Sequence, residues 1–214
     1  MCKLCRLKRI SIQSLVIIVR NAGLKGLVHR DFPLKEFKVE VIKGDANTEL
    51  KKVVARFRWN KERAVVFLDP YGIKLDYSTL DYLAKTRAVD VWYLFSLMGA
   101  QRMLKNTGVE DPTWRTKLCR LFGDDSWEKE FYHESAQGNL FGNPEIEKDA
   151  NTEKVYNYIC RRLENIFPKV ARTERVFSNS RNSNMFLFLF AVASENRAAQ
   201  DLALKIANYL LEKW

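Results

Sequence analysis

The sequence predicts an α/β protein built around a parallel sheet, and three observations support this. Short apolar or β-branched runs alternate with amphipathic helical segments between residues 38 and 95. Some of these runs are continuously apolar, which is typical of strands covered on both faces of a sheet. The runs end in polar turn residues, as expected when right-handed crossovers place each following loop at one edge.

The first half of the chain supplies most of the predicted strands and the helices between them. Helices are expected at residues 48–57 and 78–85, where apolar side chains recur at helical spacing. The strands on either side of each helix would then form βαβ units. The predicted strands are residues 14–19 (S-L-V-I-I-V), 38–42 (K-V-E-V-I), 64–68 (A-V-V-F-L) and 89–95 (V-D-V-W-Y-L-F).

The second half is mostly helical and ends in a β-pair and a helix. Residues 99–134 are rich in aromatic and charged residues, and residues 135–151 form a polar loop. A helix at 152–167 follows, with an N-cap at Asn151 or Thr152. A β-pair at 175–179 and 185–193 precedes a final helix at 197–213, whose inward side is predicted to be Leu202, Ile206, Tyr209 and Leu210.

These elements suggest a core of residues 1–98 and 151–214, interrupted by a helical insertion at residues 99–150. The 214 residues, 47% of them hydrophobic, suffice for one sizeable core. The longest apolar runs are too short to cross a bilayer, and no cleaved leader is recognisable. We therefore expect a cytoplasmic protein with no membrane partner.

The net charge of +10 is concentrated near the N-terminus, because most of the excess of Lys and Arg lies in residues 1–60. A basic end of this kind suits contact with nucleic-acid phosphates, and a solvated lysine-rich surface would look the same. Among the cysteines, Cys2 and Cys5 form a C-x-x-C pair. A zinc site needs two further ligands at defined spacing, and only His29 and His133 are present, so no metal is predicted.

Two aspartates follow predicted strands, and each has two interpretations. Asp45 lies in the turn 44–47, where its carboxylate could accept a hydrogen bond from an adenine amino group or cap the following helix. Asp69 begins the turn Asp69–Pro70–Tyr71–Gly72, which ends a buried strand. This stiff turn would project carboxylate and carbonyl oxygens into a cleft, although a simple tight turn with proline at its second position fits too.

The second turn supplies what an enzyme needs in order to alkylate an exocyclic amine. Oxygen acceptors hold the amine protons and orient the nitrogen lone pair, while an aromatic ring holds the base in place. In this interpretation Asp69 and Pro70 orient the amine, and Tyr71 stacks on the base.

Four stretches of the chain resemble the three-Cys-motif partner proteins. The resemblance covers the chain from about Phe32 onward and implies a Rossmann-like class I methyltransferase sheet with a winged-helix-like helical insertion. In such a sheet the final strand is inserted antiparallel beside its neighbours. The resemblance also implies S-adenosylmethionine as cofactor and a three-cysteine, radical-enzyme-like protein as partner. The stretches are A-V-V-F-L-D-P-Y-G, T-R-A-V-D-V-W-Y-L-F-S, W-R-T-K-L-C-R-L-F-G-D-D-S-W and F-S-N-S-R-N-S-N-M-F-L-F-L-F-A-V-A-S.

The resemblance further implies roles for individual residues. D-P-Y-G is similar to the motif of tRNA guanine-N2 methyltransferases, so by analogy an amine in nucleic acid is the implied target. Asp69, Pro70, Tyr71 and Gly72 would form the catalytic site, and Asp45 and Ala46 would contact the adenine of the cofactor. Basic residues of the insertion would reach a phosphate backbone or form an exposed helix face: Arg102, Lys105, Arg115, Lys117 and Arg120.

The N-terminal part departs from the family pattern. Family members carry a glycine-rich loop after the first strand and an acidic residue after the second, whereas residues 1–13 contain no glycine. The strand 14–19 is followed by Arg20 and Asn21 rather than by an acid. The chain is therefore either truncated at its N-terminus or a divergent, non-catalytic member that binds nucleic acid or a partner. In both cases we expect little or no methyl transfer by this chain.

Overall fold

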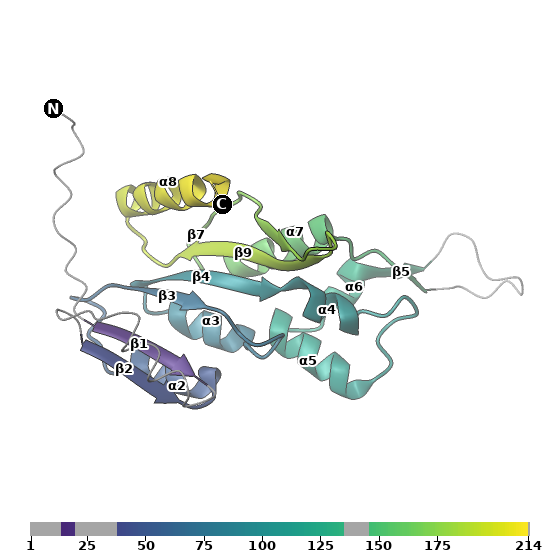
Figure 1. Ribbon diagram of the computed structural model, residues 1–214, viewed down its shortest axis with the longest axis horizontal. Helices are drawn as coiled ribbons and strands as arrows, with labels where there is room; N and C mark the ends of the chain where they lie inside the picture. The colour runs from purple at the N-terminus through teal and green to yellow at the C-terminus, as the bar shows by residue number, and fades with distance from the viewer. Residues whose placement is uncertain (1–13, 20–37, 135–145, 214) are drawn as a thin grey trace, which may run out of the picture. The chain divides into compact units, whose positions relative to one another are not determined.

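A computed structural model describes residues 14–19, 38–134 and 146–213 of the chain (Figure 1). The chain divides into two compact units, Met1–Val53 and Val54–Trp214, and each is described by itself. No helix in the described ranges is long and apolar enough to cross a membrane. The region that the sequence marks as a helical insertion belongs to the second unit, together with the main sheet.

The first unit contains a parallel pair of strands followed by a helix. β1 (Ser14–Val19) pairs with β2 (Lys38–Lys43), from Ser14 opposite Lys38 to Val19 opposite Lys43. The helix α2 (Ala46–Val54) begins directly after Asp45. It starts earlier than predicted because Asp45 accepts a hydrogen bond from the backbone N–H of Thr48 at 3.1 Å, which fixes the first turn.

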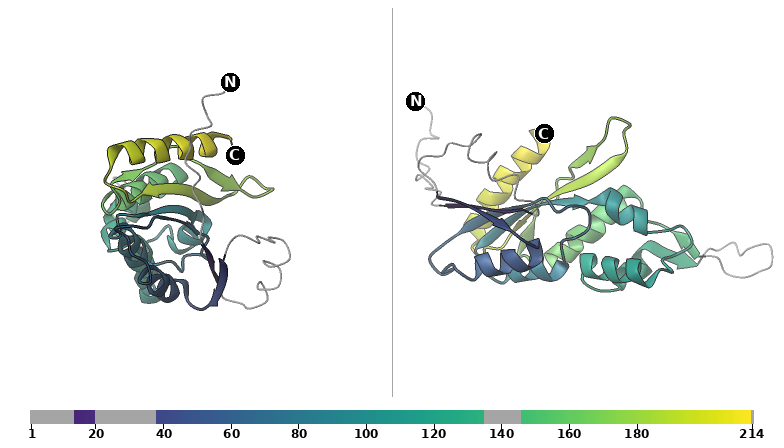
Figure 2. Two further views of the ribbon diagram at one scale, coloured as in Figure 1. Left: turned by 90° about the vertical axis from the view of Figure 1, so that its left-hand side faces the viewer. Right: turned by 60° about the horizontal axis from the view of Figure 1, so that its bottom comes forward.

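The second unit is built on a mixed sheet with the strand order β3-β4-β9-β7 (Figure 1). β3 and β4 are parallel, and β9 runs antiparallel to both of its neighbours, β4 and β7. This confirms the α/β class and the predicted late antiparallel strand. β8 pairs with the other end of β9 to form a hairpin, visible on the right of Figure 2. The strands are β3 (Ala64–Leu68), β4 (Val89–Ser96), β7 (Lys169–Val170), β8 (Val176–Ser178) and β9 (Asn184–Val192).

The prediction of one parallel sheet across residues 38–95 is not met by the described strands. β1 and β2 form one ladder, and β3 and β4 belong to another. The pattern of apolar residues correctly identified each of these strands. It carried no information on which strands would pair, because pairing depends on contacts between segments distant in the sequence.

Some helices of the second unit begin at residues that cap them. Asp111 accepts a hydrogen bond from the Thr113 N–H at 2.7 Å and precedes Pro112 at the start of α5. Asn151 accepts one from the Lys154 N–H at 2.8 Å, which confirms one of the two predicted N-caps of α7. The remaining elements are α3 (Tyr77–Ala84), α4 (Leu97–Met103), α5 (Pro112–Phe122), α6 (Ser126–Phe131), β5 (Tyr132–Glu134), β6 (Ile146–Lys148), α7 (Thr152–Glu164) and α8 (Arg197–Lys213).

One face of the sheet packs against helices and forms the main core. Val91, Tyr93 and Phe95 alternate along β4 toward this face and are almost fully buried. Phe122 of α5 extends the core, because its ring centroid lies 6.1 Å from that of Phe95 and 5.2 Å from that of Tyr158 in α7. The helices between β4 and β7 therefore share one core with the sheet.

The opposite face of the sheet is covered only in part, by α8. Phe190 of β9 forms a buried cluster there with Ala207 and Leu211 of α8. The strand β3 lies at the edge of the sheet, and its Val65 and Phe67 are 66% and 60% exposed. The prediction that the apolar strands are covered on both faces is therefore wrong for β3 as the structure describes it.

The apolar side of α8 that was predicted to face inward is exposed instead. The pattern of α8 contains more than one apolar stripe, and periodicity favoured the bulkier one. Ala207 allows the helix to approach β9 closely, which explains why the stripe with the smaller residue is buried. The exposed fractions are 52% for Leu202, 50% for Ile206, 54% for Tyr209 and 38% for Leu210, whereas Gln200, Ala207 and Leu211 are buried.

Asp90 of β4 makes the stability of the fold depend on pH. Its Oδ1 atom accepts a hydrogen bond from the Ala193 N–H at 2.9 Å, and burial is the main reason why its pKa is raised above the ordinary value of 3.8. Because folding favours the protonated carboxyl, the stabilisation is full at low pH and is lost as the pH rises through the raised pKa. Asp90→Asn would keep the oxygen acceptor and remove the buried charge.

We therefore expect Asp90→Asn to unfold at a higher urea concentration than the unmodified chain at pH 7. The difference should disappear below pH 3.8, where the carboxyl is protonated in both the folded and the unfolded state. Urea denaturation followed by circular dichroism at the two pH values measures this. A lower midpoint for Asp90→Asn at pH 7 would mean that the hydrogen bond from the Ala193 N–H and the attraction of Arg63, which both lower the pKa of Asp90, together outweigh the cost of burial.

Candidate functional site at the carboxyl edge of β3 and β4

The loop Asp69–Gly72 leaves β3 as an exposed turn. Leu68, the last residue of the strand, is buried, whereas Asp69 is exposed and Tyr71 is 83% exposed. Gly72 has a φ of 65°, in the left-handed region where a side chain is strained. The turn therefore requires glycine at position 72, and it holds a carboxylate and an aromatic ring outside the core.

The loop after β3 and the helix after β4 meet at the same edge of the sheet. A Cβ atom added to Gly99 of α4 would lie 2.7 Å from the Oγ atom of Ser96 and 3.0 Å from the Cγ2 atom of Ile73. Gly99 thus allows α4 to approach the segment that follows Asp69–Gly72. The prediction that successive loops share the carboxyl edge is confirmed for the parallel strands β3 and β4.

The ring of Tyr71 is accessible from solvent and lies near a positive charge. The Lys74 Nζ atom is 5.5 Å from the centroid of the ring, within the range of a cation–π interaction. The Asp69 carboxylate, two residues before the ring, supplies hydrogen-bond acceptors. A planar group that carries an amine can stack on such a ring and donate to such a carboxylate.

Asp45 serves as a helix cap, the second of its two interpretations. Its Oδ1 atom accepts hydrogen bonds from the Thr48 N–H at 3.1 Å and from the Thr48 hydroxyl at 3.4 Å. A Cβ atom on Gly44 would lie 2.5 Å from the Cγ atom of Glu49, so this glycine makes room for a side chain of the same unit. Ala46 is the first residue of α2.

These contacts concern the part of the first unit that was expected to bind S-adenosylmethionine. The carboxylate expected to contact the adenine is engaged in its own helix, and the glycine beside it is explained by Glu49. The cap engages the Oδ1 atom of Asp45, and no methyl-transfer step follows from the described residues. Residues 1–13, with Cys2 and Cys5, and the segment with Arg20, Asn21 and His29 lie outside the described residues.

The five basic residues expected to contact phosphates differ in their surroundings. Arg115 lies 2.5 Å from Glu128 and 3.4 Å from Asp125, and Arg120 lies 2.7 Å from Asp76. Each of these arginines must leave an acid before it can bind a phosphate. The other three are exposed: Arg102, whose Nη2 atom is 3.9 Å from the Met98 sulfur, Lys105, whose Nζ atom is 5.1 Å from the Trp114 ring centroid, and Lys117.

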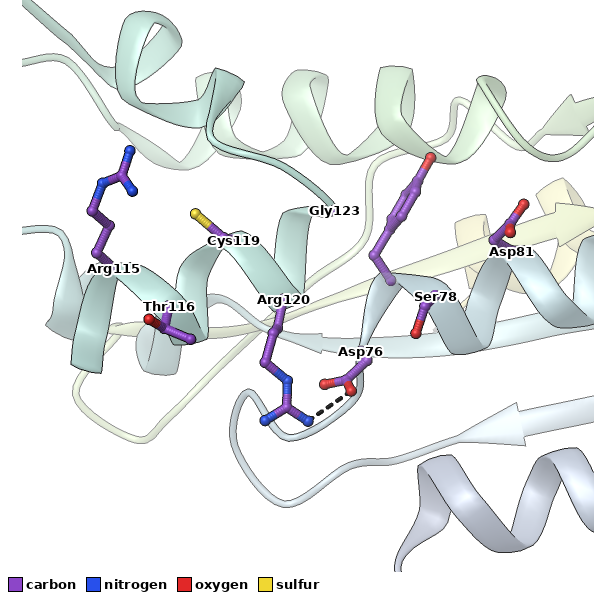
Figure 3. Close-up of a pocket in the computed structure, with 9 residues that line it drawn as sticks. Asp76, Ser78, Asp81, Arg115, Thr116, Cys119, Arg120 and Gly123 are labelled. Carbon is purple, nitrogen blue, oxygen red and sulfur yellow. Dashed lines mark hydrogen bonds and ion pairs between the residues drawn. The ribbon is translucent and has the colours of Figure 1, made fainter. Parts of the chain in front are cut away.

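A groove of about 560 Å³ separates α3 from α5 (Figure 3). The ion pair between Asp76 and Arg120 crosses it, and Arg115 projects from α5 in a different direction from Arg120 (Figure 3). No sequence pattern indicates this groove, because Asp76 and Arg120 are 44 residues apart. The ion pair connects the two helices, and because Asp76 and Arg120 are already paired with each other, the groove does not form an anion site.

Tyr77 lines the groove and contacts α7. Its hydroxyl donates a hydrogen bond to the carbonyl oxygen of Arg162 at 2.7 Å, and its ring lies 4.9 Å from the guanidinium carbon of the same residue. Burial raises the pKa of Tyr77, with a smaller opposing effect from Arg162. The phenol therefore remains protonated at neutral pH and acts as a hydrogen-bond donor between α3 and α7.

The side chains at the carboxyl edge of β3 and β4 are thus the best candidates for a binding site in the described part of the chain. No family model, curated protein or solved structure matches this chain.

Proposed function

We propose that this chain binds single-stranded nucleic acid and that the loop Asp69–Gly72 holds one unstacked base. The observation that carries the proposal is the 83% exposed ring of Tyr71, held beside Asp69 at the carboxyl edge of a parallel strand pair. An aromatic ring in water gains by stacking on another flat surface, and nucleic-acid bases offer such surfaces.

The chemistry of the loop favours bases with an exocyclic amine. An ionised Asp69 accepts hydrogen bonds and cannot donate them, so it suits the amino groups of adenine, cytosine and guanine. Those groups are accessible together with the face of the ring only when the base is unpaired and unstacked. A single strand or a loop is therefore the proposed ligand, in preference to a regular duplex.

Phosphate contacts would come from the basic residues of the same unit. Arg102 follows the start of α4, which touches the loop segment through Gly99, and Lys105 and Lys117 are exposed as well. Binding through such contacts releases counterions, so the affinity is expected to fall steeply as salt is added. The overall charge of +10 supports an anionic ligand for the chain, and most of the excess of Lys and Arg lies in residues 1–60.

Methyl transfer to the bound amine is a second candidate function, and we propose it for the lineage rather than for this chain. Two features favour methyl transfer: the D-P-Y-G turn at the end of β3, and a sheet in which β9 is inserted antiparallel. Such a sheet supports the proposal of a class I methyltransferase-like fold, whereas the proposal of a three-cysteine partner rests on the sequence resemblance alone. The capping role of Asp45 argues against cofactor binding by this chain. Calorimetric titration that gave micromolar binding of S-adenosylmethionine would reverse this conclusion.

The binding proposal predicts a specific loss of affinity in Tyr71→Ala. Stacking of one base on an aromatic residue contributes ~1–3 kcal/mol, so the dissociation constant for a fluorescein-labelled single strand should rise about 5- to 150-fold. Tyr71→Phe keeps the ring and should bind almost as the unmodified chain does. Fluorescence anisotropy at low salt measures all three proteins with the same oligonucleotide.

The matched control is Tyr82→Ala, which removes a partly exposed tyrosine from α3. It should leave the affinity unchanged if the loop is the site. Equal affinities for Tyr71→Ala, Tyr82→Ala and the unmodified chain would exclude the loop as a base-binding site. Asp69→Asn separates the two contacts, because it keeps the stacking ring and should reduce only the preference for amine-bearing bases over uracil or thymine.

A further inference from the structure

Within the second unit, the described residues leave an apolar surface exposed. We call it the uncovered face and define it by Val65 and Phe67 of β3 with Leu202, Ile206, Tyr209 and Leu210 of α8. Their exposed fractions, from 38% to 66%, correspond to roughly 600 Å² of accessible side-chain area, at ~150–250 Å² for a large side chain. A patch of this size is at the upper limit for a monomeric protein.

The strand part and the helix part of the uncovered face lie on the same side of the sheet. Phe67 is opposite Trp92 in the parallel ladder, so both side chains point to one face. The Phe67 ring centroid is 5.9 Å from that of Phe188, and Trp92 and Phe188 pack against the cluster under α8. Trp92 and Phe188 therefore form a continuous apolar floor between β3 and α8.

A hydrogen bond shows which flank of α8 is turned toward β3. The Thr173 hydroxyl donates to the Oδ1 atom of Asn208 at 3.0 Å, and Thr173 follows β7 at the sheet edge opposite β3. Asn208 thus marks the flank of α8 that faces away from β3. Ile206 and Leu210 lie on the other flank of the helix, which is turned toward β4 and β3.

Apolar residues lie on several sides of α8, as in a helix that is packed between two layers. Its underside is buried on β9 through Ala207 and Leu211. Leu202 and Tyr209 lie close to the opposite side, and Ile206 and Leu210 lie on the flank toward β3. Polar and charged residues gather on the remaining flank: Asp201, Lys205, Asn208 and Glu212. A helix at the surface of a monomer needs one apolar side, whereas α8 has three.

We propose that a second copy of this chain covers the uncovered face in a two-fold symmetric dimer. Each α8 would lie over the floor beside β3 of the other copy, so that both helices form one layer between two sheets. Leu202 and Tyr209 would contact β3 of the other copy, and Ile206 and Leu210 would meet the other α8. The same surface of each copy carries both α8 and the apolar floor that receives the other α8, as a two-fold contact requires.

The area of the uncovered face supports a second copy as the occupant. A stable contact buries about 800 Å² on each partner, and its centre is more apolar than its rim. The roughly 600 Å² of apolar area on each copy would fill most of such a contact. The proposal is independent of nucleic-acid binding, because Tyr71 is not part of the uncovered face.

The test measures the molecular mass of the chain in solution and then introduces opposite charges on the two sides of the proposed contact. Light scattering after gel filtration should give twice the chain mass of 25.0 kDa at micromolar concentration. Leu202→Lys and Phe67→Glu, made separately, should each give the monomer mass. Mixed in equal amounts they should form a dimer again, since one contact of the mixed dimer is unchanged and the other joins lysine to glutamate. Ile146→Lys, at a 54% exposed apolar residue in β6, should leave the dimer intact.

Several results would overturn the proposal. These are a monomer mass for the unmodified chain, a dimer that neither variant disrupts, or a mixture of folded variants that does not dimerise. Circular dichroism establishes that the variants are folded. If either variant is unfolded, hydrogen exchange on the unmodified chain tests whether the chain forms a dimer. Amides of α8 should exchange at least tenfold more slowly in concentrated than in dilute protein, and equal rates would contradict a dimer.

Discussion

Phe122→Ala is expected to lower the free energy of unfolding by ~3–5 kcal/mol, the usual cost of removing a buried phenylalanine. Phe122 is fully buried, and its ring contacts those of Phe95 in β4, Phe131 in α6 and Tyr158 in α7. The substitution would leave a cavity where the sheet and three helices meet. Urea denaturation followed by circular dichroism gives the free energy of unfolding of both proteins.

The same measurement tests whether the helices after β4 share one core with the sheet. We expect one cooperative transition that shifts as a whole in Phe122→Ala. Phe177→Ala serves as the control, because Phe177 lies in the β8–β9 hairpin and is only partly buried, so its loss should cost much less. Two separate transitions, of which Phe122→Ala shifts only one, would show that residues 99–150 form a domain of their own.

Gly123→Ala should also destabilise the second unit, for two reasons that add. Gly123 ends α5 with a φ of 102°, which strains any residue with a side chain. An added Cβ atom would also lie 2.5 Å from the Tyr77 ring and 2.7 Å from the Arg162 guanidinium. Together these effects are expected to lower the free energy of unfolding by ~2–4 kcal/mol.

Gly108→Ala is the matched control for Gly123→Ala. Gly108 has a φ of 90°, but a Cβ atom added there would meet nothing within 4 Å. It should therefore show only the cost of backbone strain, ~1–2 kcal/mol. If the two variants lose equal stability in urea, the junction of α3, α5 and α7 around Gly123 is not as close as the structure shows.

The secondary structure of this chain could be predicted well from the sequence, because it follows from local patterns. The strand at 64–68 and the helix at 197–213 have the predicted bounds, and Asn151 caps α7 as expected. Each of these features depends on apolar periodicity or on a capping residue within a few positions.

Features that depend on distant contacts could not be predicted. Arg120 was expected to reach phosphates, but it pairs with Asp76 across the groove. The side of α8 that faces the sheet was predicted wrongly, since the helix has apolar residues on several sides and only the position of β9 selects among them. Asp45 was left with two interpretations, and the hydrogen bond from the Thr48 N–H supports the cap.

The D-P-Y-G turn is the one candidate site for which sequence and structure agree on position. Its place after an apolar strand predicted that it would lie at the carboxyl edge of the sheet, and Asp69 and Tyr71 are exposed there. What the turn binds remains our proposal, and one measurement tests it directly.

That measurement is photochemical cross-linking of the unmodified chain to a single strand that contains 4-thiouridine, followed by mass spectrometry of the tryptic peptides. Uridine lacks the exocyclic amine but can stack on Tyr71, so it reports the position of the base. We predict an adduct on the peptide 64–74, which lies between the cleavage sites at Arg63 and Lys74 and contains Tyr71. Adducts confined to other peptides, such as those from the basic residues 1–60, would contradict the assignment of the base-binding site to the loop Asp69–Gly72.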